Sequence, residues 1–278
     1  MRNKMKKPGK MLIKISVALA GITLTVTVIF FTPLWGTAIL LSFLSATGCY
    51  ELLIPTGVIK SKTAACCCII LSTAIVWFPY FDMFENGLVM LSLLLLTFVP
   101  ICFAVSGRFG ESKSIAYIFL AILIFPAFFS LLLPVMKEKA GNQLVLIPFI
   151  AAWSADTGAQ FGGMAFGKHK LAPHISPNKS IEGFICGLFG GTLGMGIYEL
   201  IIYLMGRPVP VVSLLAFGML GAAFGTVGDL FFSYIKREHG LKDFGSLMPE
   251  HGGVLDRFDS VVFVIPLFYI YMNLFTVA

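Results

Sequence analysis

Long apolar runs separated by short polar stretches dominate this chain. An α-helix needs about 20 apolar residues to cross a bilayer. Nine runs meet or approach that length: 12–31, 34–53, 63–81, 87–106, 114–136, 143–167, 183–206, 209–235 and 257–277. The pattern predicts an all-α, polytopic integral membrane protein with about nine transmembrane helices and no soluble domain. The first run follows a basic segment, as in a signal peptide, but its length predicts a retained first helix.

Composition supports a lipid environment and the distribution of basic residues predicts an orientation. Hydrophobic residues make up 58% of the 278 residues, and charged residues only 12%, against about a quarter in soluble domains. With the N-terminus in the cytoplasm, the opposite side holds only three of the 20 Lys and Arg residues: Lys137, Lys139 and Arg207. The positive-inside rule therefore predicts a cytoplasmic N-terminus in a multi-pass protein of the cell (inner) membrane. The net charge of +6 is then a topology signal, and no nucleic acid partner is expected.

The six cysteines lie within apolar runs, and no two of them form a C-x-x-C pair. Metal ligands and disulfide frameworks need other spacings. We expect buried, reduced and inert thiols.

Three ionisable residues stand out within the apolar runs: Asp156, Glu199 and Asp229. Charged groups inside a membrane are costly, so each is a candidate functional residue. Asp156 either faces a polar funnel open to the cytoplasm or hydrogen bonds to Ser154, Thr157 or another helix. Glycines follow it at spacings that favour close packing against a neighbouring helix. For Glu199, a structural hydrogen bond to a neighbouring helix is favoured.

Three carboxylates are predicted to meet at the cytoplasmic side of the membrane. Asp229 lies near the end of the eighth run, and Asp256 and Asp259 lie three residues apart at the start of the ninth. On a helix this spacing places both on one face. Such carboxylates suit Mg²⁺, which takes one or two carboxylates plus substrate phosphates. Alternatively, Asp256 and Asp259 form an interfacial ion-pair network with basic neighbours: Arg257, Lys242 and Lys236.

The two longest polar loops, 168–182 and 236–256, both fall on the predicted cytoplasmic side. Two prolines make the first loop rigid rather than helical, and Lys168, Lys170 and Lys179 could bind phosphates or simply an anionic lipid surface. In the second, basic groups lie beside glycines and carboxylates, as in a metal-nucleotide phosphate site. A solvated loop is the alternative.

Two blocks resemble a known family. Residues 233–259 read SYIKREHGLKDFGSLMPEHGGVLDRFD. This segment resembles the signature of phosphatidate cytidylyltransferases (CDP-diacylglycerol synthases), with Met248 where Leu, Ile or Phe is usual. Residues 156–183 resemble a second family segment, with Gln160 where an aromatic residue is common and Ser180 where Thr is common. The N-terminal half is similar to the family only in being helical and apolar.

The resemblance implies a Mg²⁺-dependent reaction of CTP with phosphatidate that gives CDP-diacylglycerol and pyrophosphate. It further implies a membrane-lipid setting, a homodimer and room for a second, monovalent or divalent, cation. Asp229 and Asp256 are then the preferred metal ligands, with Asp259 and Asp243 next, and His251 donates a hydrogen bond to phosphate or to metal-bound water. The residues implied for the substrates are Asp156, Lys168, Lys170, Ser176, Lys179, Lys236, Arg237, Lys242 and Arg257.

Within this interpretation, residues 1–142 form an N-terminal transmembrane region and residues 143–278 the catalytic region. Two rival functions remain. One is a transporter or channel that uses Asp156 and Glu199, against which the absence of an inverted repeat argues. The other is a different CTP-using lipid enzyme, since the preferred lipid backbone is not readable from the residues.

Overall fold

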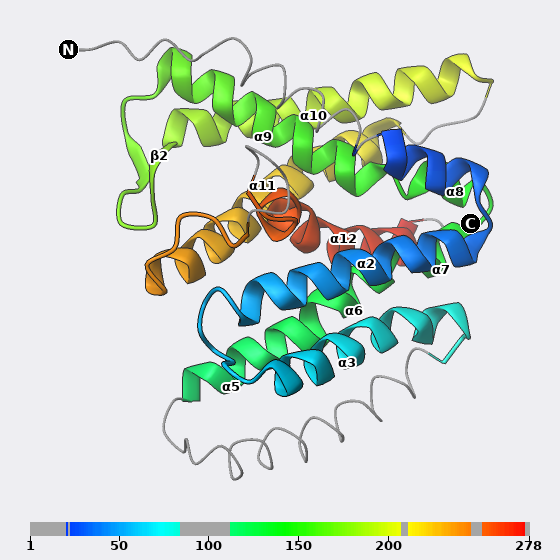
Figure 1. Ribbon diagram of the computed structural model, residues 1–278. Coiled ribbons are helices and arrows are strands. Elements are labelled where there is room, and N and C mark those ends of the chain that lie inside the picture. Colours follow the sequence, from blue (N-terminus) through cyan, green and yellow to red (C-terminus); the bar gives the residue numbers. More distant parts are fainter. Residues whose placement is uncertain (1–20, 22, 84–111, 207–210, 246–251, 276–278) are drawn as a thin grey trace. The chain divides into compact units, whose positions relative to one another are not determined.

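The computed structural model of the chain describes residues 21, 23–83, 112–206, 211–245 and 252–275 (Figure 1). Within them, seven helical segments are long and apolar enough to cross a membrane: Leu34–Leu53, Lys62–Tyr80, Ala116–Lys137, Gly141–Phe166, Ile181–Leu204, Ser213–Glu238 and Leu255–Phe275. They correspond within a few residues to seven of the nine predicted spans. The run 87–106 and half of the run 12–31 lie outside the described residues. The polytopic helical architecture is confirmed, and the count of nine spans stays a prediction.

The chain divides into two compact units that are not contiguous in sequence. The first comprises Met1–Pro134 and Leu241–Arg257, and the second comprises Val135–Gly240 and Phe258–Ala278. Helix α7 (Leu132–Lys137) and helix α12 (Leu255–Phe275) each begin in the first unit and end in the second. The predicted boundary at residue 143 separates a catalytic region from the rest of the chain by activity. The division into compact units does not test activity, so this boundary stays a prediction.

The first unit is built on α2 (Leu34–Leu53), α3 (Lys62–Tyr80), α5 (Ser112–Phe119), η1 (Leu120–Ile124) and α6 (Phe125–Ser130). Helix α2 packs along α3, and α6 contacts both. Phe125 is fully buried and lies against Gly48, where a Cβ atom would come within 2.2 Å of the ring. Glycine at this position therefore lets the aromatic ring of α6 approach the α2 backbone.

The second unit contains α8 (Gly141–Leu144), α9 (Ile147–Phe166), α10 (Ile181–Leu204), α11 (Val211–Glu238) and most of α12. Helices α9 and α10 pack together most extensively. A Cβ atom on Gly158 would lie 2.8 Å from the Cys186 carbonyl oxygen, and one on Gly190 would lie 2.8 Å from the Ser154 carbonyl oxygen. The predicted close packing at the glycines of α9 is confirmed, because two backbones meet there without side chains between them.

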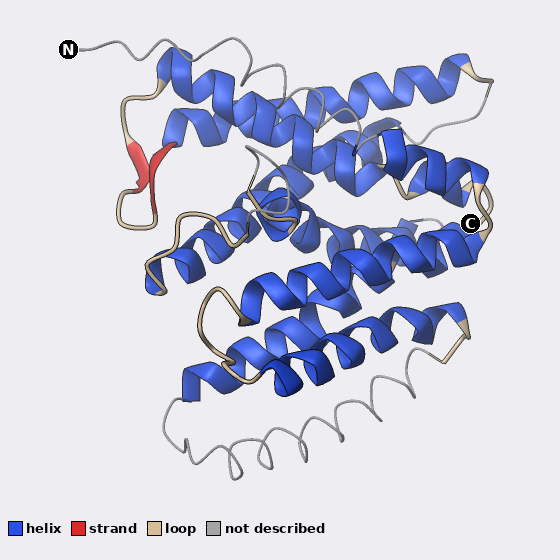
Figure 2. Ribbon diagram, in the orientation of Figure 1, coloured by secondary structure: helices blue, strands red, loops and turns tan. Residues whose placement is uncertain are grey.

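A small hairpin connects α9 to α10 in this otherwise all-α protein (Figure 2). Strand β1 (Lys170–Ala172) pairs antiparallel with β2 (Ser176–Ser180). Lys170 Nζ donates to the Pro177 carbonyl oxygen at 2.7 Å across the hairpin. The Ser180 hydroxyl then accepts from the Gly183 amide at 3.1 Å and caps α10. The prediction that this loop is not helical is confirmed for residues 168–180, since proline disfavours helix. Its predicted rigidity stays a prediction.

The five cysteines within the described residues are free thiols, as expected. Their expected burial is wrong for Cys66, which is exposed on α3. A transmembrane helix presents such apolar side chains to lipid rather than to a protein interior.

Candidate active site

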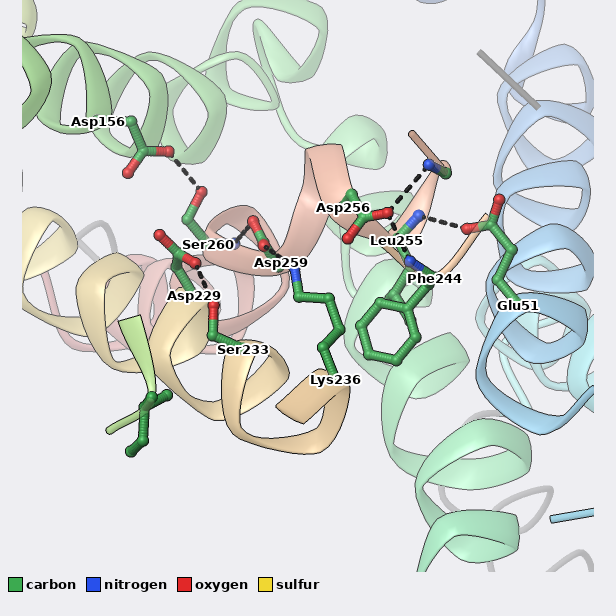
Figure 3. Close-up of polar contacts among 12 residues, drawn as sticks. Glu51, Asp156, Asp229, Ser233, Lys236, Phe244, Leu255, Asp256, Asp259 and Ser260 are labelled. Atoms are coloured by element: carbon green, nitrogen blue, oxygen red, sulfur yellow. Dashed lines mark hydrogen bonds and ion pairs between the residues drawn. The ribbon is translucent and has the colours of Figure 1, made fainter. Parts of the chain in front are cut away.

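The second unit gathers three carboxylates and two lysines, which we call the acid–lysine cluster: Asp156 on α9, Lys179 on β2, Asp229 and Lys236 on α11, and Asp259 on α12. Electrostatic repulsion couples Asp259 with both Asp229 and Asp156. Figure 3 shows the three carboxylates on neighbouring helices of this unit. The cluster therefore contains one more acidic than basic side chain.

Asp229 is held from two sides. Lys179 Nζ lies 2.5 Å from Asp229 Oδ2, and both side chains are about three-quarters buried, with 24% and 26% of their surface exposed. The Ser233 hydroxyl, one helical turn further along α11, donates to Asp229 Oδ1 at 3.1 Å (Figure 3). Two predicted site residues from distant parts of the chain are thus in direct contact.

Asp259 is buried and interacts with a buried lysine. Lys236 Nζ lies 3.9 Å from Asp259 Oδ2, and the Ser260 amide donates to Asp259 Oδ1 at 2.9 Å. Buried charges are stable only when they are paired and hydrogen-bonded. The predicted alternative of an ion pair with Lys236 is therefore observed for Asp259, inside the helical bundle rather than at a solvated surface.

Asp156 is bound by a neighbouring helix. The Ser260 hydroxyl of α12 donates to Asp156 Oδ2 at 2.9 Å (Figure 3). The hydroxyls of Ser154 and Thr157 donate instead to carbonyl oxygens of their own helix. Asp156 therefore has the predicted partner on another helix, Ser260, and not Ser154 or Thr157.

A cavity of about 510 Å³ opens beside Asp156, Lys179 and Asp229, so that all three reach its surface. Its wall is formed by α9, the β2 strand, α10 and α11, and includes these further residues: Ala159, Gln160, Gly163, Met164, Leu171, Asn178, Ser180, Gly183, Phe184 and Thr226. A pocket with charged, amide and apolar side chains in its wall therefore lies beside Asp156. The predicted opening of a polar funnel to the cytoplasm stays a prediction. This volume lies in the range of small-molecule sites.

Three further basic residues of the predicted site lie on and around the hairpin. Lys168 and Lys170 are exposed, and Ser176 begins β2. Arg237 is also exposed, and its Nε donates to the Ile175 carbonyl oxygen in the hairpin turn at 3.3 Å. The hairpin therefore brings several of the predicted substrate-binding residues to the same end of α9, α10 and α11.

Glu182 is a structural residue of this region that the sequence reasoning missed. Its carboxylate accepts from the Lys168 amide at 3.0 Å and from the His169 amide at 3.2 Å, and lies 2.6 Å from His169 Nδ1. A carboxylate in the first turn of a helix is also favoured by the helix dipole. Glu182 therefore fastens the start of the hairpin to the start of α10.

The structural hydrogen bond predicted for Glu199 is only partly tested by the structure. It is buried, with 4% of its surface exposed, and within the described part of the chain its Oε1 atom has no hydrogen-bond partner. The predicted structural hydrogen bond is therefore absent at this oxygen.

In the first unit, Asp256 organises the segment before α12. Its Oδ2 atom accepts from the Phe244 amide at 2.8 Å and from the Gly253 amide at 3.0 Å (Figure 3). Arg257 is exposed, as are Lys242 and Asp243. His251 lies outside the described residues. The predicted meeting of Asp256 with Asp229, which belongs to the second unit, stays a prediction.

Glu51 on α2 is the second residue that sequence reasoning missed. It lies inside an apolar run and is 3% exposed. Its two carboxylate oxygens accept from the Val254 and Leu255 amides. The rule that ionisable residues inside membrane spans are functional candidates would have identified it.

The donor chemistry of the cluster fits a hard divalent cation. Within the described ranges, no group of three or more His, Cys, Asp or Glu side chains is arranged to hold a metal ion. Mg²⁺, however, usually takes only one or two carboxylates and completes its octahedron with water and substrate phosphates. Asp229 lines the cavity and Asp259 lies close enough to repel it, so these residues meet that lower requirement.

Fold and site together define a polytopic helical membrane protein with a charged, cavity-forming site among its C-terminal helices. The chain belongs to the Cytidylyltransferase family, whose profile it matches over residues 12–275.

Similar proteins include three named phosphatidate cytidylyltransferase. The one from Bacillus subtilis (strain 168) is 40% identical over 139 residues, which are 50% of this chain and 51% of the relative. The one from Staphylococcus aureus (strain COL) is 45% identical over 130 residues, 47% and 49% of the two chains. The one from Staphylococcus saprophyticus is 36% identical over 184 residues, 66% and 68% of the two chains. In the first two cases the match spans about half the length of the relative.

Proposed function

We propose that this protein is a phosphatidate cytidylyltransferase, which forms CDP-diacylglycerol from CTP and phosphatidate for phospholipid synthesis. Membership of the Cytidylyltransferase family and similarity to three proteins of that name support the proposal. The structural observation that carries it is the cavity where Asp156, Lys179 and Asp229 meet.

The reaction demands positioning and charge neutralisation more than a protein nucleophile. A phosphate monoester carries a charge between about −1.5 and −2 at pH 7, so an oxygen of phosphatidate can itself attack the α-phosphorus of CTP. The new bond joins this oxygen to the α-phosphorus, and the bond from the α-phosphorus to the α–β bridging oxygen breaks. Its electron pair leaves with pyrophosphate. Positioning and electrostatic stabilisation supply most of the catalysis in phosphoryl transfer.

The acid–lysine cluster offers these functions. Lys179 reaches the cavity and would neutralise phosphate charge there, with Lys168, Lys170, Ser176 and Arg237 near the hairpin as further contacts. Lys236 is buried against Asp259, so its role is to balance that carboxylate and orient it. Asp156, fixed by Ser260, would orient a substrate group in the cavity.

Mg²⁺, when bound, would supply charge neutralisation for the triphosphate. Asp229, Asp256 and Asp259 are the proposed metal ligands, with room for a second, monovalent or divalent, cation. Asp256 already holds two backbone amides through Oδ2, so only its other oxygen would turn to a metal. Asp243, Lys242, His251 and Arg257 remain proposed contributors from the segment before α12.

The setting is also part of the proposal. We place the site at the cytoplasmic face, where CTP arrives from the cytosol and phosphatidate enters sideways from the inner leaflet, in a homodimer. The distribution of basic residues supports this orientation.

The test supplies purified protein in detergent with radiolabelled CTP, phosphatidate and Mg²⁺, and measures labelled CDP-lipid and pyrophosphate. We expect both products in equal amounts, and a loss of activity in Asp229→Ala and Asp256→Ala. Glu138→Gln, which removes an exposed carboxylate outside the site, is the matched control and should remain active. If the wild-type protein forms no CDP-lipid, or if both alanine variants retain full activity, the proposal fails. Ion flux in proteoliposomes without nucleotide would instead favour a transporter.

A further inference from the structure

The Glu51 carboxylate is bound at both oxygens by a segment about 200 residues away in the sequence. The Val254 amide donates to Oε1 at 3.0 Å, and the Leu255 amide donates to Oε2 at 2.8 Å (Figure 3). Leu255 is the first residue of α12. Glu51 thus satisfies amides at the start of this helix, where backbone N–H groups lack partners within the helix and favour negative charge.

Two glycines of the same segment leave room for this carboxylate. A Cβ atom on Gly245 would lie 2.4 Å from Glu51 Oε1, and one on Gly253 would lie 2.4 Å from Oε2. Neither glycine has a positive φ angle, so backbone conformation does not require glycine there. A Cβ atom at either position would instead force the Glu51 carboxylate or the backbone to shift.

A second carboxylate fixes the same segment from the other direction. Asp256 Oδ2 accepts from the amides of Phe244 and Gly253. Glu51 and Asp256 together therefore bind four backbone amides on either side of residues 246–251. Glu51 belongs to α2, whereas Asp256 belongs to the segment that it holds, so only Glu51 anchors that segment to another transmembrane helix.

We infer that Glu51 is a positioning residue for the proposed reaction: it fixes residues 253–255 and thereby the turn of α12 from which Asp256 projects. The inference rests on the proposed function, in which Asp256 and its neighbours act on metal and phosphate. A residue that only stabilises the fold would change the amount of folded protein. A positioning residue changes the rate per folded molecule, since small displacements of catalytic groups reduce turnover strongly.

The first test is Glu51→Gln, which keeps the shape of the side chain but replaces one acceptor oxygen with a donor. A hydrogen bond to a charged acceptor contributes about 1.5–3 kcal/mol, so hydrogen exchange in peptides covering residues 252–258 should accelerate about 10- to 100-fold. We expect kcat to fall about tenfold or more, while the KM for phosphatidate stays within about twofold, as for an interaction expressed in the transition state. The thermal midpoint should change little, because the segment loosens locally.

The matched control is Glu199→Gln, which makes the same change at another buried carboxylate of the chain. Nothing in the described residues connects Glu199 with residues 244–255, so kcat and exchange in that segment should stay near wild type. Equal losses in both variants would show that any buried carboxylate matters for the fold, and would overturn the inference.

The glycine contact supplies an independent test. Gly253→Ala places a methyl group against Oε2, so it should lower kcat in the wild-type background as Glu51→Gln does. In a Glu51→Ala background the methyl group has room, and the same substitution should cause no further loss. Fully additive losses would contradict the proposed contact.

Besides equal losses in the Glu199→Gln control, three results would overturn the inference: unchanged exchange in Glu51→Gln, an activity loss explained by the loss of folded protein, or additive losses in the double variant. Failure of the wild-type protein to form CDP-lipid is a different outcome. It would remove the proposed function, and hydrogen exchange would still decide whether Glu51 holds the start of α12.

Discussion

The contact between Lys179 and Asp229 allows a test between two interpretations. The two residues either form only a structural ion pair or also act on the substrates. We consider four proteins: wild type, Lys179→Met, Asp229→Asn and the double variant. The two charged atoms lie 2.5 Å apart and about three-quarters of each side chain is buried. The pair should therefore be stronger than a solvated ion pair, which contributes about 0–1 kcal/mol, and its coupling should resemble the about 1.5–3 kcal/mol of a charged hydrogen bond.

Activity should behave differently from stability. Each single variant leaves an unbalanced charge and lowers stability, and the neutral double variant should recover part of that loss. If Lys179 neutralises phosphate and Asp229 binds metal, each single variant also loses about 10²–10³-fold in turnover, the usual effect of removing one electrostatic contact to a transition state. The double variant then stays as inactive as either single variant.

The assay measures CDP-lipid formation from radiolabelled CTP, alongside thermal unfolding in detergent. Ser233→Ala is the matched control, because it removes a hydrogen bond to Asp229 Oδ1 and leaves the carboxylate charge in place. It should cost only a few-fold in turnover. Recovery of more than about a third of wild-type activity in the double variant would refute the reasoning, because non-additivity of that kind marks a purely mutual interaction.

Three further predictions follow from contacts of the second unit and from the charge distribution. Glu182→Gln weakens the attachment of the hairpin and should raise the KM for CTP several-fold, measured in the same assay. Gly158→Ala forces a methyl group against the α10 backbone and should lower stability by about 1–3 kcal/mol, whereas Gly196→Ala, with a nearest neighbour at 3.4 Å, should be tolerated in thermal unfolding. In a background without native cysteines, an impermeant maleimide should label Lys139→Cys but not His174→Cys in intact cells; the reverse pattern would contradict the predicted orientation.

Much of the fold follows directly from the sequence because the bilayer restricts the possibilities. Apolar runs of about 20 residues can only be helices when lipid surrounds them, so seven spans agree with prediction to within a few residues. The hairpin between α9 and α10 was harder to predict from the sequence. Its strands have three and five residues, and the second carries Pro177, so this short pairing depends on the helices at either end rather than on a strand pattern.

The candidate site also has features that the sequence predicts and features that it does not. Asp156, Lys179 and Asp229 stand out in the sequence as charges within or beside apolar runs, and the structure places all three around one cavity. Their partners could not be predicted. Ser260 is an ordinary polar residue in the sequence, and only the packing of α12 against α9 makes it the donor to Asp156.

The sequence by itself determined the environment of this protein, its helices and its candidate charges, because those depend on residue type and on spacing along one element. The tertiary structure alone decided which charges interact: Lys236 with Asp259, Glu182 with the hairpin, and Glu51 with the start of α12. Such pairings are decided by helix packing across long sequence separations. The cost of burying a charge favours a partner for each one, but it does not specify which partner.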